Sequence, residues 1–451
     1  MRKFKLWTAL AVCAVLAACG GGGGGSGSSS SSNQNTTVNG STSYTQVIAG
    51  PGSNAAVMTV AAAPANSGVV VANVPMVSVT ICLPNSPSTC ATINNVQVDT
   101  GSSGFRVLSS ALDSAFTSAT WQAGLPQVTA PTTGSPPEAE CMTFADGIAF
   151  GGVRKANLTV ASESAANLNI EVIGDSAAPR PTTGQVNSGE TAAAQTALAS
   201  CENLANQSTP QTLHANGVLG VGTAVDDCYY CHSGTNATPM YYSCTTGSSP
   251  TCSNLNGTTL SSANIVTNPV ASFPTDNNGV IVELPPVGAS GAATATGVLV
   301  FGIGTASNNG LGSAQVFGAD SITGNITTSF QGNSYDNSFF DSGSNSLFFT
   351  ASIATCADSS TFYCPSSTQA LTAMIEGTNG VNATLNFSVA NTDTLTQSGN
   401  YAFDDQAGTA GTYFASNATF DWGLPAFYGR NVFTAMVGKN TPGGAGPYYA
   451  F

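Results

Sequence analysis

Two short acidic turns, far apart in the chain, constrain the fold more than any other feature of the sequence. Each turn follows an apolar segment, begins with an Asp, and runs through a small hydroxylated residue, a Gly and a Ser before the chain becomes apolar again. Aligned on their acids, the turns match Asp99 with Asp341, Thr100 with Ser342, Gly101 with Gly343 and Ser102 with Ser344. One Asp at the start of a turn is common. Two such turns predict duplicated β lobes that each supply one carboxylate to a shared site.

The paired turns resemble those of the pepsin-like aspartic peptidases, in which each of two lobes supplies one Asp-Thr/Ser-Gly turn. In that family a hydrophobic-hydrophobic-Gly segment packs behind each turn. Three segments fit in order: 217–222 with Gly220 behind the first turn, 297–302 as the strand that opens the second lobe, and 427–431 with Gly429 behind the second turn. The resemblance covers residues 68–451. It implies an all-β, bilobal architecture, with two related β-barrel lobes, a cleft between them, and Asp99 and Asp341 as the catalytic pair.

The C-terminal run FDWGLPAFYGR, 420–430, carries a second resemblance. It is similar to the ending of an uncharacterised family of bacterial lipoproteins with the same tether and Cys-rich insertion. Arg430 follows a Gly directly, as an Arg does in retroviral-type aspartic peptidases (retropepsins), where it is structural. Asp421, Trp422 and Arg430 are therefore expected to pack and form ion pairs first and to contact substrate second.

The resemblance implies a specific chemistry at the two acids. Two carboxyl groups within hydrogen-bonding distance share one proton, because both cannot ionise cheaply. The ionised acid takes a proton from a trapped water, and the protonated acid donates to the carbonyl oxygen of the peptide. The flanking residues have supporting roles: Gly101 and Gly343 let the backbone approach the acids, Thr100 and Ser342 bond to the opposite lobe, and Ser102 and Ser344 bond the outer carboxylate oxygens. This reaction predicts no metal and no cofactor.

The sequence departs from the family at the element that closes the cleft. Active members have a hairpin flap whose Tyr bonds a Trp just after the first Asp turn. Here Arg106 follows Phe105, and the best candidate flap, 141–152, has Phe144 followed by Asp146. Two interpretations stay open: Arg106 faces Asp146 across the cleft, or it is a solvated strand residue. In either case substrate closure works differently, or catalysis has been lost.

The N-terminus predicts export and a lipid anchor. Residues 1–19 have the basic start and short apolar core of a secretory signal peptide, and the core is too short to span a bilayer. Its end, Leu-Ala-Ala-Cys, resembles the bacterial lipoprotein cleavage box and implies lipidation of Cys19; an ordinary signal peptide is the alternative. Gly20, rather than Asp, favours the outer membrane of the cell envelope, facing the periplasm or the cell surface. Residues 20–67 are expected to form a flexible tether.

The rest of the chain suits two lobes, 68–292 with a Cys-rich insertion at 226–252, and 293–451. Abundant Gly, recurrent Thr and Val, and sparse charge favour an all-β fold, and helical periodicity is confined to 190–206 and 366–376. The net charge of −14, from 9 Lys and Arg against 23 Asp and Glu, argues against nucleic acid and anionic headgroups as partners. The expected partners are a peptide or protein substrate or ligand, and a membrane reached only through the N-terminal lipid. The chain is expected to be monomeric.

The cysteines predict disulfides. The chain has 12 Cys, of which Cys13 lies in the signal peptide and Cys19 at the lipid. An even number remains, which suits an oxidising compartment. Neighbouring positions suggest Cys82–Cys90 and Cys356–Cys364. Cys141 with Cys201, and two bridges among Cys228, Cys231, Cys244 and Cys252, would complete the set. Cys228, Cys231 and His232 also fit the spacing for c-type haem, but the surrounding Gly, Ser, Thr and Pro favour a disulfide-stapled loop. Zinc is disfavoured because oxidised cysteines do not ligate it.

Two functions of different classes remain. The first is a membrane-anchored envelope endopeptidase that hydrolyses peptide bonds with Asp99 and Asp341. The second is a catalytically inactive pepsin-like module that binds peptide, glycan or another envelope protein in the same cleft. A serine hydrolase is disfavoured, since His214 and His232 are the only histidines and no GxSxG motif occurs.

Overall fold

The computed structural model describes residues 36–37, 52–62, 71–180, 201, 205–235, 239–247, 251–357, 359–413 and 418–451. These residues belong to one unit of the fold, Asn35–Phe451. The predicted signal peptide, Cys19 and the first part of the predicted tether lie outside the described residues. Within the described part of the chain, no helix has both the length and the apolar character needed to cross a bilayer.

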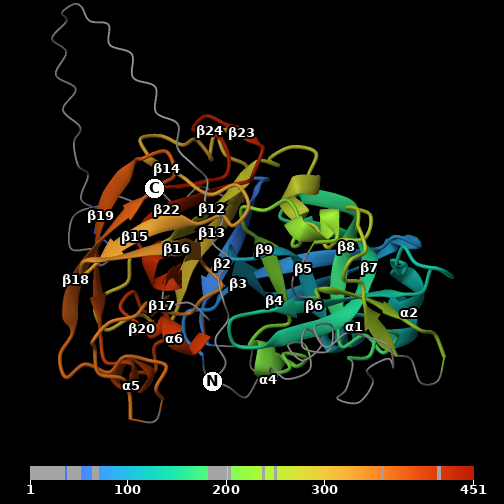
Figure 1. Ribbon diagram of the computed structural model, residues 1–451, viewed down its shortest axis with the longest axis horizontal. Coiled ribbons are helices and arrows are strands. Elements are labelled where there is room, and N and C mark those ends of the chain that lie inside the picture. Colours follow the sequence, from blue (N-terminus) through green and yellow to red (C-terminus); the bar gives the residue numbers. More distant parts are fainter. Residues whose placement is uncertain are drawn as a thin grey trace, which may run out of the picture. The chain divides into compact units, whose positions relative to one another are not determined.

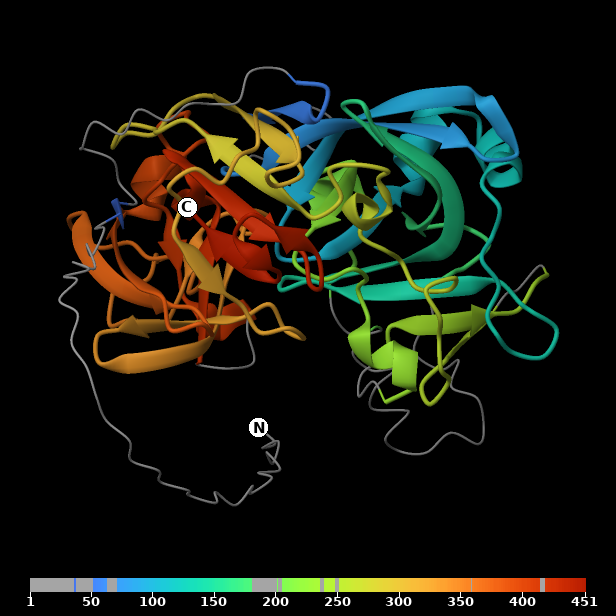
Figure 2. The same ribbon diagram turned by 90° about the horizontal axis from the view of Figure 1, so that it is seen from above.

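The architecture is all-β, as the composition predicts. In the described residues the larger sheet has 15 strands, in the order β11 (Cys252–Asn254), β10 (Tyr241–Cys244), β6 (Glu138–Thr143), β7 (Ile148–Val160), β8 (Glu163–Ile173), β5 (Ser103–Leu108), β9 (Gly217–Val221), β4 (Ser86–Asp99), β3 (Pro75–Leu83), β2 (Ala55–Val60), β13 (Ala295–Phe301), β12 (Gly279–Leu284), β22 (Arg430–Ala435), β25 (Tyr448–Ala450) and β14 (Val316–Gly318). The strands from β11 to β2 in this order come from residues 55–254. The blue to green strands of this sheet lie on one side of the described fold, and the orange and red strands lie on the other (Figure 1, Figure 2).

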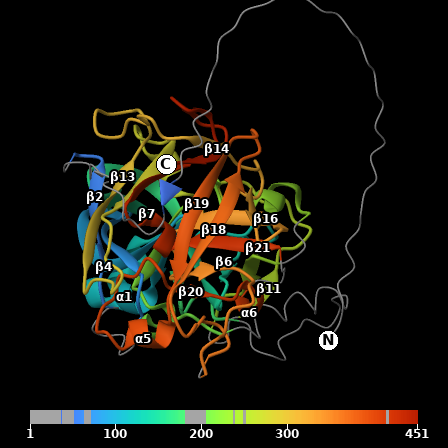
Figure 3. The same cartoon turned by 90° about the vertical axis from the view of Figure 1, so that its left-hand side faces the viewer.

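A second sheet belongs almost entirely to the C-terminal half. Its described strands are, in order, β1 (Thr36–Thr37), β19 (Asn382–Val389), β18 (Gln369–Glu376), β15 (Ile326–Phe330), β16 (Asn333–Asp341), β21 (Thr419–Gly423), β17 (Leu347–Phe348) and β20 (Ala407–Gly408). Figure 3 shows this sheet from the side on which β18 and β19 lie. A short ribbon of β23 (Asn440–Thr441) and β24 (Gly444–Ala445) stands apart from both sheets.

Among the described residues, helices are short and lie between strands. They are α1 (Ser109–Ala115), α2 (Ser118–Gly124), α4 (Pro210–Leu213), α5 (Thr392–Thr396) and α6 (Ala410–Tyr413), with 3-10 turns η1 (Tyr229–Ser233), η2 (Pro269–Ser272) and η3 (Leu424–Phe427). The predicted helix at 366–376 is wrong, because most of that segment forms β18, whose residues alternate between exposed and buried at its C-terminal end. Most of the other predicted helix, 190–206, lies outside the described residues.

The same local arrangement occurs twice and carries the two acidic turns. In the first copy, β4 ends at Asp99, and β9 lies parallel to β4 and antiparallel to β5, which leaves the turn. In the second copy, β16 ends at Asp341, and β21 lies parallel to β16 and antiparallel to β17. The duplicated setting that the sequence predicts is therefore present in the fold, with one copy in each sheet.

Part of the predicted tether forms strand β2 instead. Residues 20–67 were expected to be flexible throughout, but β2 pairs with β13 on one side and with β3 on the other. Met58 and Val60 are fully buried, because the alternating apolar residues of this segment satisfy the two-residue period of a strand. Since β2 links strands of the N-terminal half to strands of the C-terminal half in one sheet, the lobe boundary near residue 292 stays a prediction.

The core beneath the second turn is aromatic. Phe349 stacks on Phe420 with centroids 4.8 Å apart, and Phe420 stacks on Trp422 at 4.5 Å. Phe340, the residue before Asp341, stacks on Trp422. Aromatic pairs of this kind contribute about 0.5–1.5 kcal/mol beyond the area they bury. They fix β16, β17 and β21 around the turn.

The described cysteines form five disulfides. They join Cys82 to Cys90, Cys141 to Cys201, Cys228 to Cys231, Cys244 to Cys252, and Cys356 to Cys364. The first and last of these are the pairs that sequence proximity suggested, and Cys141–Cys201 is the pair expected to complete the set. The remaining two settle which cysteines of the insertion pair with each other.

Candidate active site

The two acidic turns bond to each other reciprocally. The Thr100 amide donates to Ser342 Oγ at 3.1 Å, and the Ser342 amide donates to Thr100 Oγ1 at 2.9 Å. Each hydroxyl then donates onward to a backbone oxygen of the opposite copy, Thr100 to Phe340 and Ser342 to Val98, both at 2.9 Å. All of these groups are buried, so the bonds are shielded from water. The arrangement locks the two turns face to face.

Each carboxyl group is also held by its own turn. The amide of Gly101 donates to Asp99 Oδ1 at 2.8 Å, and the Ser102 hydroxyl donates to Oδ2 at 2.5 Å. The second turn repeats this pattern. The Gly343 amide donates to Asp341 Oδ1 at 2.7 Å and the Ser344 hydroxyl to Oδ2 at 2.8 Å.

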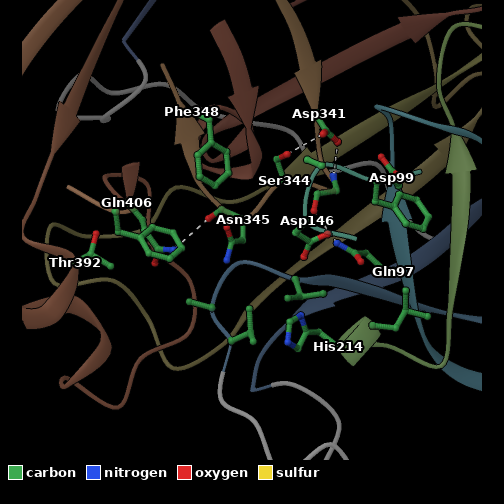
Figure 4. Close-up of a pocket in the computed structure, with 18 of the residues that line it drawn as sticks. Gln97, Asp99, Asp146, His214, Asp341, Ser344, Asn345, Phe348, Thr392 and Gln406 are labelled. Carbon is green, nitrogen blue, oxygen red and sulfur yellow. Dashed lines mark hydrogen bonds between the residues drawn. The ribbon is translucent and has the colours of Figure 1, made fainter. Parts of the chain in front are cut away.

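The glycines show how closely the acids approach. A Cβ at Gly101 would lie 2.5 Å from Asp341 Cγ, and a Cβ at Gly343 would lie 2.6 Å from Asp99 Oδ1. Each carboxyl group therefore lies against the glycine of the opposite turn, where only glycine leaves room. Figure 4 shows Asp99 and Asp341 beside each other at the edge of one pocket.

Burial and mutual charge set the protonation of the pair. Burial raises the pKa of Asp341 well above its usual range, and the charge of Asp99 and a hydrogen bond with Asp99 raise it further. The Ser344 hydroxyl and the Gly343 amide oppose this change in pKa. An acid that keeps its proton beside a second acid is the arrangement needed for a shared proton.

The glycine behind the second turn differs from the one the sequence predicted. In the first copy Gly220 lies opposite Asp99, as predicted, and in the second copy Gly423 lies opposite Asp341. A Cβ at either position would clash with the facing turn, at 2.8 Å from Gly104 O and 2.1 Å from Ser346 O respectively.

The assignment of Gly429 to that place is therefore wrong. Gly429 comes after η3, where it has a φ of 73° and its amide donates to Leu284 O at 2.9 Å. Both Gly423 and Gly429 follow an aromatic residue, so the local pattern alone does not separate them.

Both interpretations of Arg106 from the sequence are wrong. Its side chain is fully buried, so it is not a solvated strand residue, and its partners are three carboxylates rather than Asp146. The ion pairs measure 2.5 Å to Glu140, 3.2 Å to Glu171 and 2.5 Å to Asp227. These acids come from β6, β8 and the insertion, and nothing in the local sequence marks them as partners.

The candidate flap lies over the same cavity as the acids. The turn between β6 and β7 contains Phe144 and Asp146, and the Phe144 amide donates to Gly147 O at 2.8 Å. Asp146 accepts a hydrogen bond from Gln207 at 2.5 Å. Both Phe144 and Asp146 line a cavity of about 450 Å³ that also contains Asp99 and Asp341.

Polar and apolar residues both line the cavity. Lining residues that sequence reasoning missed include Gln97, Gln207 and His214 from the N-terminal half, and Asn345, Phe348 and Gln406 from the C-terminal half. Figure 4 labels Gln97, His214, Asn345, Phe348 and Gln406. Gln97 bridges the copies, because its amide donates to Gly343 O at 2.8 Å. Burial lowers the pKa of His214, and the charge of Asp146 opposes that change in pKa.

The disulfides bear on the haem and metal alternatives. Cys228 and Cys231 are joined to each other, and His232 bonds Asp226 at 2.7 Å. Sulfur atoms joined in a disulfide do not form thioether bonds to haem. Among the described residues, Cys356, Cys364 and Asp393 come together as possible metal ligands, but the two cysteines form a disulfide and offer no thiolate.

The two face-to-face Asp turns and the cavity above them define a pepsin-like fold of the all-β class. The chain belongs to the family described as protein of unknown function (DUF3443), whose model matches residues 50–451. No curated protein matches the sequence. A solved structure similar to this chain is an aspartic proteinase from Irpex lacteus, which is 14% identical and covers 88% of this chain and 96% of its own, with a TM-score of 0.44.

Proposed function

We propose that the protein is an acid endopeptidase that hydrolyses peptide bonds with a water held between Asp99 and Asp341. The observation that carries the proposal is the pair of carboxyl groups locked face to face by reciprocal bonds between Thr100 and Ser342. Holding two acids in this geometry before substrate arrives removes the entropy of assembling them during the reaction.

The reaction follows from the protonation of the pair. The ionised carboxylate takes a proton from the water as its oxygen attacks the peptide carbonyl carbon, and the protonated carboxyl donates its proton to the carbonyl oxygen. The carboxyl that took the water proton then gives it to the nitrogen of the tetrahedral intermediate, and the C–N bond breaks. A hydroxyl of the intermediate returns its proton to the other carboxylate as the new carboxyl product forms, so the pair again holds one proton. The raised pKa of Asp341 supports its role as the protonated partner at acid and neutral pH.

The test is cleavage of reduced and alkylated serum albumin between pH 3 and pH 5. We expect fragments from the native protein, inhibition by pepstatin, and loss of cleavage in Asp99→Asn and in Asp341→Asn. Asp393→Asn is the matched control, because Asp393 lines the same cavity outside the two turns. Cleavage that survives both substitutions in the turns, or that needs Asp393 equally, rules out the proposed pair.

One observation favours an inactive binding module as the second candidate. Phe144 and Arg106 occupy the positions of the Tyr and Trp expected to close the cleft. Arg106 forms its ion pairs within a buried cluster and does not line the cavity. Folded protein without cleavage from pH 3 to pH 8 that still binds pepstatin or a peptide by calorimetry supports this function instead.

The lipid anchor remains a proposal that the N-terminal sequence supports. We place the protein in the cell envelope, attached through Cys19, most simply at the outer membrane, with a peptide or protein as its partner and the monomer as its working form. Metabolic labelling with a fatty acid tests the anchor. Label that is unchanged in Cys19→Ser contradicts it.

A further inference from the structure

The C-terminal wall of the cavity contains two buried polar atoms that lack a partner. The side-chain oxygen Oε1 of Gln406 and the hydroxyl Oγ1 of Thr392 have no hydrogen-bond partner among the residues that the structure describes. Gln406 is 2% exposed and Thr392 is 5% exposed, and both line the cavity that contains Asp99 and Asp341. A buried polar atom without a partner is costly, so two such atoms in one cavity wall indicate a place for polar groups of a ligand.

The side chain of Gln406 is oriented by the segment that leaves the second Asp turn. Its nitrogen donates to Ser346 Oγ at 2.9 Å and, at a longer distance of 3.5 Å, to the backbone oxygen of Asn345 (Figure 4). A backbone oxygen only accepts hydrogen bonds, so the nitrogen of the glutamine, and not its oxygen, faces Asn345. The Leu347 amide donates to the backbone oxygen of Gln406 at 3.1 Å. The side-chain oxygen is therefore left as a fixed acceptor.

Backbone hydrogen bonds hold Thr392 close to the same glutamine. The Thr392 amide donates to Tyr363 O at 3.1 Å, and the Tyr363 amide donates to Ala407 O at 2.9 Å. The Ala390 amide donates to Asp405 O at 2.9 Å. Since the glutamine lies between Asp405 and Ala407, the two atoms without partners belong to neighbouring segments of one wall.

This part of the wall is connected to the candidate acids. Asn345 directly follows Ser344, whose hydroxyl donates to Asp341 Oδ2 at 2.8 Å. Phe348 and Phe362 also line the cavity, with ring centroids 6.2 Å apart. The cavity therefore offers apolar surface for the stem of a substrate side chain and polar atoms for its end.

The two atoms without partners select the chemistry of that end. Gln406 Oε1 accepts only and needs a donor, whereas the Thr392 hydroxyl has a hydrogen to donate. A carboxamide has both an N–H donor and a carbonyl acceptor, so the side chain of a Gln or an Asn satisfies both atoms. An ammonium group has no acceptor for the threonine hydrogen, an ionised carboxylate has no donor for the glutamine oxygen, and an apolar side chain has neither.

We propose that Gln406 and Thr392 form a subsite that binds a carboxamide side chain of a peptide close to the bond that is cleaved. Gln406 Oε1 accepts a hydrogen bond from the carboxamide nitrogen, and the Thr392 hydroxyl donates to the carboxamide oxygen. Both residues determine specificity and take no part in breaking the bond. The effect on cleavage rests on the proposed function; the binding of a carboxamide does not.

Matched peptides test the subsite through kcat/KM. Each peptide carries Gln, Leu, Lys or Glu at one position on either side of a central pair of phenylalanines, and cleavage is measured at about pH 5, where a Glu side chain is mostly ionised. A buried polar atom left unpaired lowers kcat/KM about fivefold or more, so at one position we expect Gln to exceed Leu about 25-fold. Lys and Glu should also fall below Gln at that position. Cleavage of the Leu, Lys or Glu peptide as fast as the Gln peptide at every position overturns the inference.

Substitutions in the wall locate the preference. Thr392→Val keeps the shape of the side chain and removes only the hydroxyl, so the protein should stay folded by circular dichroism while the preference for Gln over Leu falls about fivefold or more. Thr392→Ser keeps the hydroxyl and should keep the preference. Thr396→Val is the matched control, because Thr396 lines the same cavity and its hydroxyl already donates to Thr392 O at 3.1 Å. An unchanged preference in Thr392→Val, or an equal loss in Thr396→Val, contradicts the subsite.

Calorimetry gives a readout that does not depend on cleavage. The same peptides are made with the central CO–NH group reduced to CH2–NH, which cannot be hydrolysed. At one position the Gln peptide should bind about 25-fold more tightly than the Leu peptide, and this ratio should fall in Thr392→Val and in Gln406→Met but not in Thr396→Val. If cleavage is absent but these ratios hold, the endopeptidase proposal fails and the subsite stands. Equal binding of the Gln and Leu peptides at every position, or no binding of either, overturns the inference.

Discussion

The reciprocal contact between the two turns predicts a specific stability loss in Thr100→Ala. The substitution removes the hydroxyl that donates to Phe340 O and accepts from the Ser342 amide, both at 2.9 Å. Thr100 is 2% exposed, so water does not replace the lost partner. Each lost hydrogen bond contributes about 1 kcal/mol, and a buried amide left without an acceptor costs about 1–3 kcal/mol. We therefore expect the free energy of unfolding to fall by about 2–4 kcal/mol.

Urea unfolding measures this loss with a probe in each half of the protein. Trp121 and Trp422 are both buried, one in each half of the chain, so fluorescence reports both halves. Thr100→Ser is the matched control, because it keeps the hydroxyl and loses only a methyl group. We expect it to cost less than about 1 kcal/mol.

Ser342→Ala completes a double-mutant cycle. It removes the acceptor of the Thr100 amide and the donor to Val98 O, so it should cost about as much as Thr100→Ala. Because the residues contact each other, the double variant should differ from the sum by about 0.5–3 kcal/mol. Native stability in Thr100→Ala, equal losses in Thr100→Ala and Thr100→Ser, or strict additivity would refute the reasoning.

Two further predictions concern the acids. Gly101→Ala places a Cβ 2.5 Å from Asp341 Cγ, which should separate the carboxyl groups and lower the cleavage rate about 100-fold. Gly288→Ala is the control, because its Cβ has open space around it and cleavage should keep the native rate. Equal cleavage rates in the two variants contradict the close approach of the carboxyl groups. Burial raises the pKa of Glu138 to about 8, so the stability it contributes is complete below about pH 4.5 and is lost as pH rises toward 8. Urea unfolding at pH 4.5 and pH 8 measures this loss of unfolding free energy. Glu138→Gln, which keeps the acceptor for Asn264, should make the difference between the two pH values smaller by about 2–4 kcal/mol. An unchanged difference contradicts the raised pKa of Glu138.

The acidic turns were predictable because their chemistry is local. Asp99, Gly101 and Ser102 bond within four consecutive residues, and the second turn repeats those bonds, so a short motif contains the whole arrangement. Disulfides between close cysteines, such as Cys82 and Cys90, were predictable for the same reason.

The errors arose where distant residues decide the outcome. Arg106 is neutralised by acids 34 and 121 positions away and by Glu171, and no local pattern reports such pairing. The segment behind the second turn was missed because Asp421 occupies the place of an apolar residue, which disguised the match to 217–222. The strand β2 was missed because it has only six residues and lies between the Gly, Pro, Ser and Asn residues of 50–54 and the Ala-Ala-Ala-Pro segment of 61–64.

The buried charge cluster also determines how the cavity closes in the proposed enzyme. Arg106 ties β5 to Glu140 of β6, and β6 leads directly into the turn that contains Phe144. The base of that hairpin is therefore fixed to the strand that leaves the first Asp turn, and only the tip is left to adjust to substrate. Phe144 packs against the core and has no hydroxyl to donate. If the proposed enzyme closes over Asp99, we therefore expect the closure to use apolar contact from Phe144, and we expect a preference for substrates with an apolar side chain beside the cleaved bond.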